Sequence, residues 1–177
     1  FLDDKNSNPI IDLQGGGSDL IFPHHEMSAA QARVSTGRSF AQFYVHTGMI
    51  GLDGQKMSKS LGNLVFVSTL VRSGVNPMTI RCALMMNGYA ADRMWDDELL
   101  LTAQSFLDSL TLALSQTQCA PTSDLIQEII QALSNNLDTK KVFALLQDWI
   151  NESAKGAEGG NPGELSRTLD ALLGVAI

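Results

Sequence analysis

Two lysines lie close together in a glycine-rich stretch of this chain. Lys56 and Lys59 belong to GLDGQKMSKSLGN, residues 51–63, in a chain of formal net charge -7. Glycines let such a loop change conformation, and lysine side chains bind phosphate groups as mobile point charges. The neighbouring serines add hydroxyl donors, and Met57 offers an apolar anchor. The pattern indicates a phosphate clamp that opens and closes, with a solvated surface turn as the alternative.

A triple glycine precedes an aspartate nearer the N-terminus. Gly15, Gly16 and Gly17 let the backbone approach a ligand closely, and open α/β sheets bind nucleotides at the carboxyl ends of their strands. The Asp19 carboxylate can accept hydrogen bonds from ribose hydroxyls. The stretch is therefore a candidate nucleotide site, although a plain tight turn also explains three glycines.

Two adjacent histidines, His24 and His25, raise the question of a metal. Adjacent residues on a helix point about 100° apart, so both rarely serve one ion. One of the two is a candidate ligand at most, and a lone histidine is more often structural.

Alternating strands and helices are predicted to carry these residues. The β-branched run from Ile10 to Leu13 predicts a strand that ends in a turn at the glycines. Helix formers from Glu26 to Val34 predict a helix that stops at Gly37. After a second apolar segment and the lysine loop, Leu64 to Val67 is a candidate short strand. The pattern up to residue 68 is therefore α/β.

The remainder of the chain has helical periodicity. Ser68 can cap a short helix that ends near Gly74, and Pro77 can open another that ends at Gly88. Apolar residues then recur three and four apart in segments 99–114, 125–133 and 142–150, and a last helix is expected over 164–173. We predict an α/β region over 1–68 followed by an all-α bundle over 69–177.

Composition narrows the class of protein. With 44% hydrophobic residues the chain can bury a core, and its longest apolar runs are far shorter than a membrane span. Cys82 and Cys119 have no CxxC spacing and favour a reduced, cytoplasmic setting with both as core residues. Acidic residues outnumber basic ones, 19 to 12, which argues against nucleic acid as a partner.

The motifs resemble a known superfamily. KMSKS at residues 56–60 is similar to the signature loop of class I aminoacyl-tRNA synthetases, and GGGSDLIFPHHE at 15–26 is similar to the matching stretch of cysteinyl-tRNA synthetases. Together with YVHTGMIGLDGQ, ADRMWDDELL and LDALLGV, they most resemble the cysteine ligases of mycothiol biosynthesis. The resemblance implies the C-terminal part of a Rossmann-like class I catalytic domain, with a helical bundle after it.

This resemblance implies a reaction and roles for individual residues. ATP and L-cysteine would form cysteinyl adenylate, and the amine of glucosaminyl-inositol would then attack it. Lys56 and Lys59 would be catalytic contacts to the ATP phosphates, with Lys59 the stronger candidate for the transition state. Gly17, Ser18 and Asp19 would bind the adenylate, and Ile50 would contact adenine.

A zinc ion is implied in the same way. The first histidine of PHHE binds zinc with two cysteines in the family, which makes His24 the candidate and leaves His25 for packing or capping. Zinc would accept the substrate thiolate and so reject serine. Cysteinyl-tRNA synthetases have a glutamate ligand four residues later, where this chain has Ser28, and this difference favours the ligase.

The family's HIGH motif and both zinc cysteines would lie upstream of Phe1. We therefore expect a C-terminal fragment that works with an upstream N-terminal half and neither makes adenylate nor holds zinc tightly alone. A cysteinyl-tRNA synthetase fragment and a non-catalytic nucleotide-binding module are the alternatives.

Overall fold

A computed structural model describes residues 8–177, and its chain divides into two compact units. Unit 1 contains the chain up to Gly51 together with the short segment Ala90–Met94, and unit 2 contains Leu52–Tyr89 and Trp95–Ile177. The lysine loop is thus grouped with the helices that follow it. A compact unit need not coincide with a domain of the family, so the predicted boundary at residue 68 stays a prediction.

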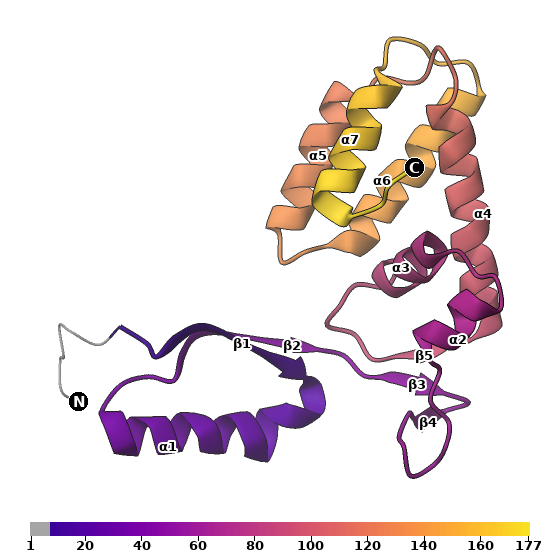
Figure 1. The fold of residues 1–177 in the computed structure, drawn as a ribbon. Coiled ribbons are helices and arrows are strands. Elements are labelled where there is room, and N and C mark those ends of the chain that lie inside the picture. Colours follow the sequence, from indigo (N-terminus) through magenta and orange to yellow (C-terminus); the bar gives the residue numbers. More distant parts are fainter. Residues whose placement is uncertain (1–7) are drawn as a thin grey trace. The chain divides into compact units, whose positions relative to one another are not determined.

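Unit 1 is built around a β–α–β arrangement (Figure 1). Strand β1 (Ile11–Gly17) pairs in parallel with β2 (Ala41–Thr47), and α1 (Glu26–Thr36) lies between them in sequence. Parallel neighbours need such a crossover connection. Two short helical turns, η1 (Ser18–Leu20) and η2 (Ile21–His25), connect β1 to α1. The predicted α/β character is confirmed, and α1 ends as expected at Gly37, which has a φ of 71°.

The triple glycine does not form the predicted turn. All three glycines continue β1, paired with Val45, His46 and Thr47 of β2. The prediction failed because glycine is rare inside strands, and here the pairing with β2 overrides that preference.

A small sheet with strand order β4-β3-β5 was not expected from the sequence. It contains β3 (Ile50–Leu52), β4 (Gln55–Lys56) and β5 (Arg93–Trp95). Asp53 and Gly54, with φ of 52° and 76°, make the two-residue connection between β3 and β4, as is typical of tight hairpins. Within unit 1, Arg93 N–H donates to the Met49 carbonyl at 2.9 Å, and Met49 N–H donates to Asp92 Oδ1 at 2.7 Å.

The predicted strand over Leu64–Val67 is wrong. Residues 64–66 have no regular structure, and α2 (Val67–Arg72) begins at the last residue of that run. A four-residue apolar run has no periodicity that separates a strand from a helix start. The following α3 (Pro77–Met85) opens at the predicted proline, and Asn76 caps it through its side chain.

The predicted helices of the C-terminal part are confirmed. They are α4 (Asp97–Leu114), α5 (Ser123–Ser134), α6 (Thr139–Ala154) and α7 (Pro162–Leu173). Side chains of Asp96, Asp138 and Asn161 cap α4, α6 and α7. The most deeply buried aliphatic side chains, each less than 2% exposed, include Leu110, Ile129, Leu146, Leu165 and Leu169. Burial of each contributes ~1.5–3 kcal/mol, so packing of these faces holds the helices together.

Both cysteines belong to this helical core, as predicted. Cys82 in α3 and Cys119 before α5 are free and 0% exposed. Burial raises the pKa of the Cys82 thiol from 9.0 to about 11, with Arg81 opposing that rise, and burial also raises the pKa of Cys119. Both thiols are therefore protonated and unreactive at neutral pH.

Candidate functional site

The predicted adenylate residues lie at the carboxyl end of β1. Gly17 is the last residue of this strand, and Ser18 and Asp19 form the turn that follows it. A Cβ atom on Gly17 would lie 2.6 Å from Asp19 Oδ1 and 3.3 Å from Met49 Sδ. The glycine thus lets the Asp19 carboxylate fold back over the backbone, where it stands exposed at the strand end.

A buried histidine lies behind the glycine strand. His25 is 7% exposed, and its Nε2 lies 3.0 Å from Gln14 Nε2 while its Nδ1 lies 2.7 Å from His46 Nε2. A Cβ on Gly16 would lie only 2.8 Å from His25 Cε1. The triple glycine therefore admits two of the protein's own side chains, His25 and Asp19, whereas the sequence pointed to a ligand or a plain tight turn.

The contacts of this network indicate a direction for its hydrogen bonds. The amide nitrogen of Gln14 can only donate, so Nε2 of His25 accepts. Nδ1 of His25 then carries the proton and donates to Nε2 of His46. The chain of donors thus runs from Gln14 through His25 to His46.

A pocket of about 220 Å³ adjoins these histidines. Its lining consists of Ile21, His25, Glu26, Ala29, Tyr44 and His46. The rings of Tyr44 and His46 are nearly parallel, with centroids 6.5 Å apart, because residues two apart on a strand share a face. Sequence reasoning missed both residues of β2, and their alternation on a strand beside a glycine-rich partner was the available signal.

His24 has surroundings unlike those of its neighbour. It is exposed, and in the part of the chain that the structure describes its imidazole makes no hydrogen bond. The Ser28 hydroxyl donates to the His24 backbone carbonyl at 2.9 Å, so this hydroxyl is hydrogen-bonded within its own helix segment. Across residues 8–177, no three His, Cys, Asp or Glu side chains gather where they could hold a metal ion. The described residues therefore supply one candidate zinc ligand, and a site would need others.

The lysine loop follows directly on the β3–β4 hairpin. Lys56 ends β4, and both Lys56 and Lys59 are exposed while Met57 is half-buried. The hydroxyls of Ser58 and Ser60 lie 3.1 Å apart, so in this conformation they hydrogen-bond each other. Their predicted role toward phosphate stays a prediction.

The candidate residues are distributed over both units. Gly17, Ser18, Asp19, His24 and Ile50 belong to unit 1, in which the side chain of Met49, next to Ile50, reaches Gly17. Ile50 begins β3 and is half-buried. Lys56 and Lys59 belong to unit 2.

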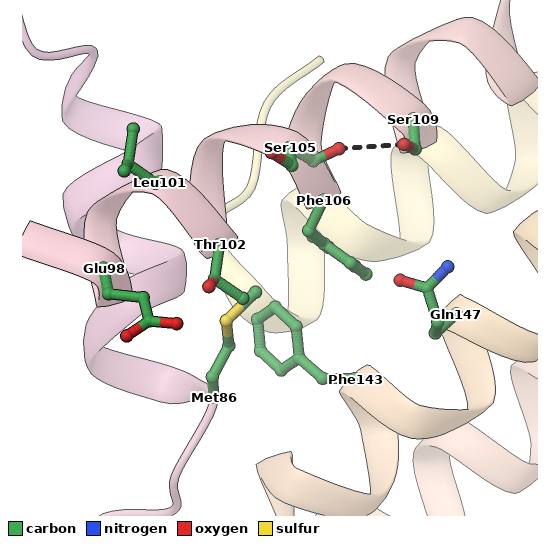
Figure 2. A pocket seen from close by; sticks show the side chains of 9 residues that line it. All are labelled: Met86, Glu98, Leu101, Thr102, Ser105, Phe106, Ser109, Phe143 and Gln147. Carbon is green, nitrogen blue, oxygen red and sulfur yellow. Dashed lines mark hydrogen bonds between the residues drawn. The ribbon is translucent and has the colours of Figure 1, made fainter.

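A second pocket, of about 660 Å³, lies among the helices of unit 2 (Figure 2). Its lining is Met86, Glu98, Leu101, Thr102, Ser105, Phe106, Ser109, Phe143 and Gln147. Figure 2 shows the carboxylate of Glu98 and the rings of Phe106 and Phe143 among the side chains that line this pocket. Its lining includes one carboxylate and neither Lys nor Arg, so it does not suit a nucleotide phosphate.

This combination of a β–α–β unit with a glycine strand end, a lysine loop and a helical unit is that of a class I synthetase catalytic region. Residues 1–105 match the family described as tRNA synthetases class I (C) catalytic domain, and the chain belongs to this family.

Two curated relatives carry the same ligase name. The chain is 48% identical over 170 residues to an L-cysteine:1D-myo-inositol 2-amino-2-deoxy-alpha-D-glucopyranoside ligase of Streptomyces coelicolor. It is 49% identical over 172 residues to the ligase of that name from Rhodococcus erythropolis. The alignments cover 94% of this chain and 42% and 41% of those relatives, so the chain spans less than half their length.

A solved structure supports the fold. The LeuRS of Agrobacterium radiobacter K84, in a ternary complex with tRNA and LeuAMS, superposes with a TM-score of 0.62 over 93% of this chain and 26% of its own. At 20% identity this likeness speaks for the fold alone. Among the described helices, none is long and apolar enough to cross a membrane.

Proposed function

We propose that this chain is the C-terminal part of an ATP-dependent ligase that joins L-cysteine to the amine of glucosaminyl-inositol in mycothiol biosynthesis. The observation that carries the proposal is the 48% identity to the Streptomyces coelicolor ligase along 94% of the chain. Because those relatives are more than twice as long, the activity belongs to a full-length protein with an N-terminal half. The 177-residue chain alone is inactive.

The reaction has two steps. A carboxylate oxygen of cysteine attacks the α-phosphorus of ATP, which forms cysteinyl adenylate and expels pyrophosphate. The sugar amine then attacks the adenylate carbonyl, forms the amide and expels AMP. The first step develops charge on the phosphates, and preorganised cations lower its barrier.

The residues of this chain take up separate tasks in that scheme. Lys56 and Lys59 neutralise the phosphates, with Lys59 acting on the leaving pyrophosphate. The exposed carboxylate of Asp19, beside Gly17 and Ser18 at the end of β1, accepts from the adenylate ribose, and Ile50 contacts adenine. Support for this assignment comes from the location of Gly17 at a strand's carboxyl end, where α/β proteins bind nucleotides.

Zinc belongs to the full-length protein in this proposal. The exposed, hydrogen-bond-free imidazole of His24 is suited to bind it, and further ligands come from outside residues 8–177. When bound, zinc would coordinate the cysteine thiolate and so discriminate against serine. The two buried cysteines of this chain are already packed in the helical core and do not serve as ligands.

The acceptor separates this proposal from a cysteinyl-tRNA synthetase, which the family description also allows. The residues after Ser60 are acidic, and the helical unit has no basic cluster beyond Lys140 and Lys141 in its sequence. Since nucleic-acid affinity depends on Lys and Arg contacts to phosphates, we propose no nucleic-acid partner. The location is a separate point: the two free, buried cysteines suit a reducing compartment, so we propose a cytoplasmic location.

One experiment tests the proposal. The full-length protein is incubated with labelled cysteine and ATP, and with either glucosaminyl-inositol or tRNA as acceptor. We expect the cysteinyl-sugar product and uncharged tRNA. Cysteinyl-tRNA without the sugar product would establish the synthetase instead, and nucleotide binding without either product would establish a non-catalytic module.

A further inference from the structure

Asn63, directly after the lysine loop, reaches back over it with both ends of its side-chain amide. Its Oδ1 accepts from the Ser58 backbone N–H at 2.9 Å, and its Nδ2 donates to the Lys56 backbone carbonyl at 3.3 Å. These two bonds span five and seven residues of chain and close a ring around the segment that contains Lys59.

Further hydrogen bonds shape the inside of this ring. Leu61 N–H donates to Ser58 Oγ at 3.3 Å, and Gly62 N–H donates to the Lys59 carbonyl at 3.3 Å. Gly62 has a φ of 68°, a conformation that favours glycine and turns the chain back so that Asn63 faces the loop. The loop is therefore internally hydrogen-bonded in this conformation, a feature that the sequence prediction of an opening and closing clamp did not include.

We propose that Asn63 is a positioning residue: its amide latches the loop so that the Lys59 ammonium is presented in one place. This inference rests on the proposed function, in which Lys59 acts on pyrophosphate. A lysine side chain is long and flexible, so fixing its backbone removes part of the entropy that would otherwise be lost at the transition state.

The chemistry of the latch requires an amide. An aspartate at position 63 would still accept from Ser58 N–H, but it would have no donor for the Lys56 carbonyl and would place a negative charge within the lysine loop. An alanine would lose both bonds. The two substitutions at Asn63 therefore remove the latch in different ways, and neither touches a lysine.

The test measures cysteine-dependent ATP–pyrophosphate exchange in the full-length protein. We expect Asn63→Ala and Asn63→Asp to lower kcat roughly tenfold, the scale of about two lost hydrogen bonds, with the KM for cysteine unchanged. The matched control is Asn76→Ala, which removes an asparagine whose side chain accepts from Met78 N–H and caps α3 in the same unit. It should reduce stability while leaving kcat unchanged.

A second measurement reports on the loop itself. Trypsin cleaves after exposed lysines, so loss of the latch should speed cleavage after Lys59 in Asn63→Ala but not in Asn76→Ala. Wild-type kcat and cleavage rate in Asn63→Ala would overturn the latch and leave the proposed function intact, as would an equal loss of kcat in Asn76→Ala. Absence of exchange in the wild type would instead overturn the proposed function, and with it the catalytic role of the latch.

Discussion

The Nδ1 atom of His25 lies 2.7 Å from Nε2 of His46, which joins the entry of α1 to strand β2 across 21 positions of sequence. Gln14 of β1 extends this contact on the other side of His25. Three elements of unit 1 thus share one partly buried polar network, and the absence of a side chain at Gly16 leaves the space that His25 occupies.

Replacement of Gly16 by alanine should therefore destabilise the protein. The new Cβ would lie 2.8 Å from His25 Cε1 and 3.0 Å from Leu20 Cδ1, so the histidine must move and its hydrogen bonds must break. We expect a loss of roughly 1–3 kcal/mol in the free energy of unfolding, measured by denaturant titration of the full-length protein. Gly15→Ala is the control, since its nearest neighbour would be 3.9 Å away. Equal losses in both variants would contradict the account.

Lys59→Ala should impair adenylation more than cysteine binding. Loss of a cation aimed at the leaving pyrophosphate costs roughly 2–4 kcal/mol at the transition state, which is seen in kcat for cysteine-dependent ATP–pyrophosphate exchange. Lys155→Ala, which removes another exposed lysine after α6, should leave the rate unchanged. Exchange at the wild-type rate in Lys59→Ala would remove this residue from the mechanism.

The two adjacent histidines should respond differently to substitution. We expect His24→Ala in the full-length protein to lower the zinc content and to erode the preference for cysteine over serine, because a metal ligand and the thiolate contact are lost. His25→Ala should chiefly lower the free energy of unfolding, since His25 is buried and hydrogen-bonded. Metal analysis and denaturation of both variants check this, and a full zinc complement in His24→Ala would exclude it as a ligand.

The buried thiol of Cys82 predicts a pH dependence at alkaline pH. Its pKa is raised from 9.0 to about 11 in the native protein, so the native state holds a proton that the unfolded state releases. This contribution to stability is complete below pH 9 and is lost as the pH rises toward about 11. Unfolding midpoints of Cys82→Ala should fall less steeply than those of the wild type over this range, and identical slopes would argue against the shift.

The sequence predicted the parts of the fold that depend on local patterns. Apolar spacing predicted the long helices, and the structure adds side-chain caps at Asp96 and Asn161 that act on the turn next to them. Pairings between distant residues were missed. Met49 hydrogen-bonds Asp92, which lies 43 positions later, and Arg93, the first residue of β5. His46 gains its role only from contact with His25.

The candidate site was predictable to a similar extent. Lys56, Lys59 and Asp19 stand out by residue type and spacing, whereas the latch function of Asn63 depends on a turn at Gly62 that no periodicity encodes. The triple glycine was predicted to allow close approach of a ligand, and in the structure side chains of the protein itself lie beside Gly16 and Gly17.

The pairing of Met49 with Asp92 and Arg93 also sets an order of events during synthesis. Strands β1 and β2 and helix α1 leave the ribosome well before the segment Ala90–Met94 that completes their unit. Segments of one compact unit generally fold together. Unit 1 therefore stays unfinished until the whole lysine loop and helix α3 have been translated, so nascent chains that stop short of Asp92 would lack the partner of the Met49 backbone N–H.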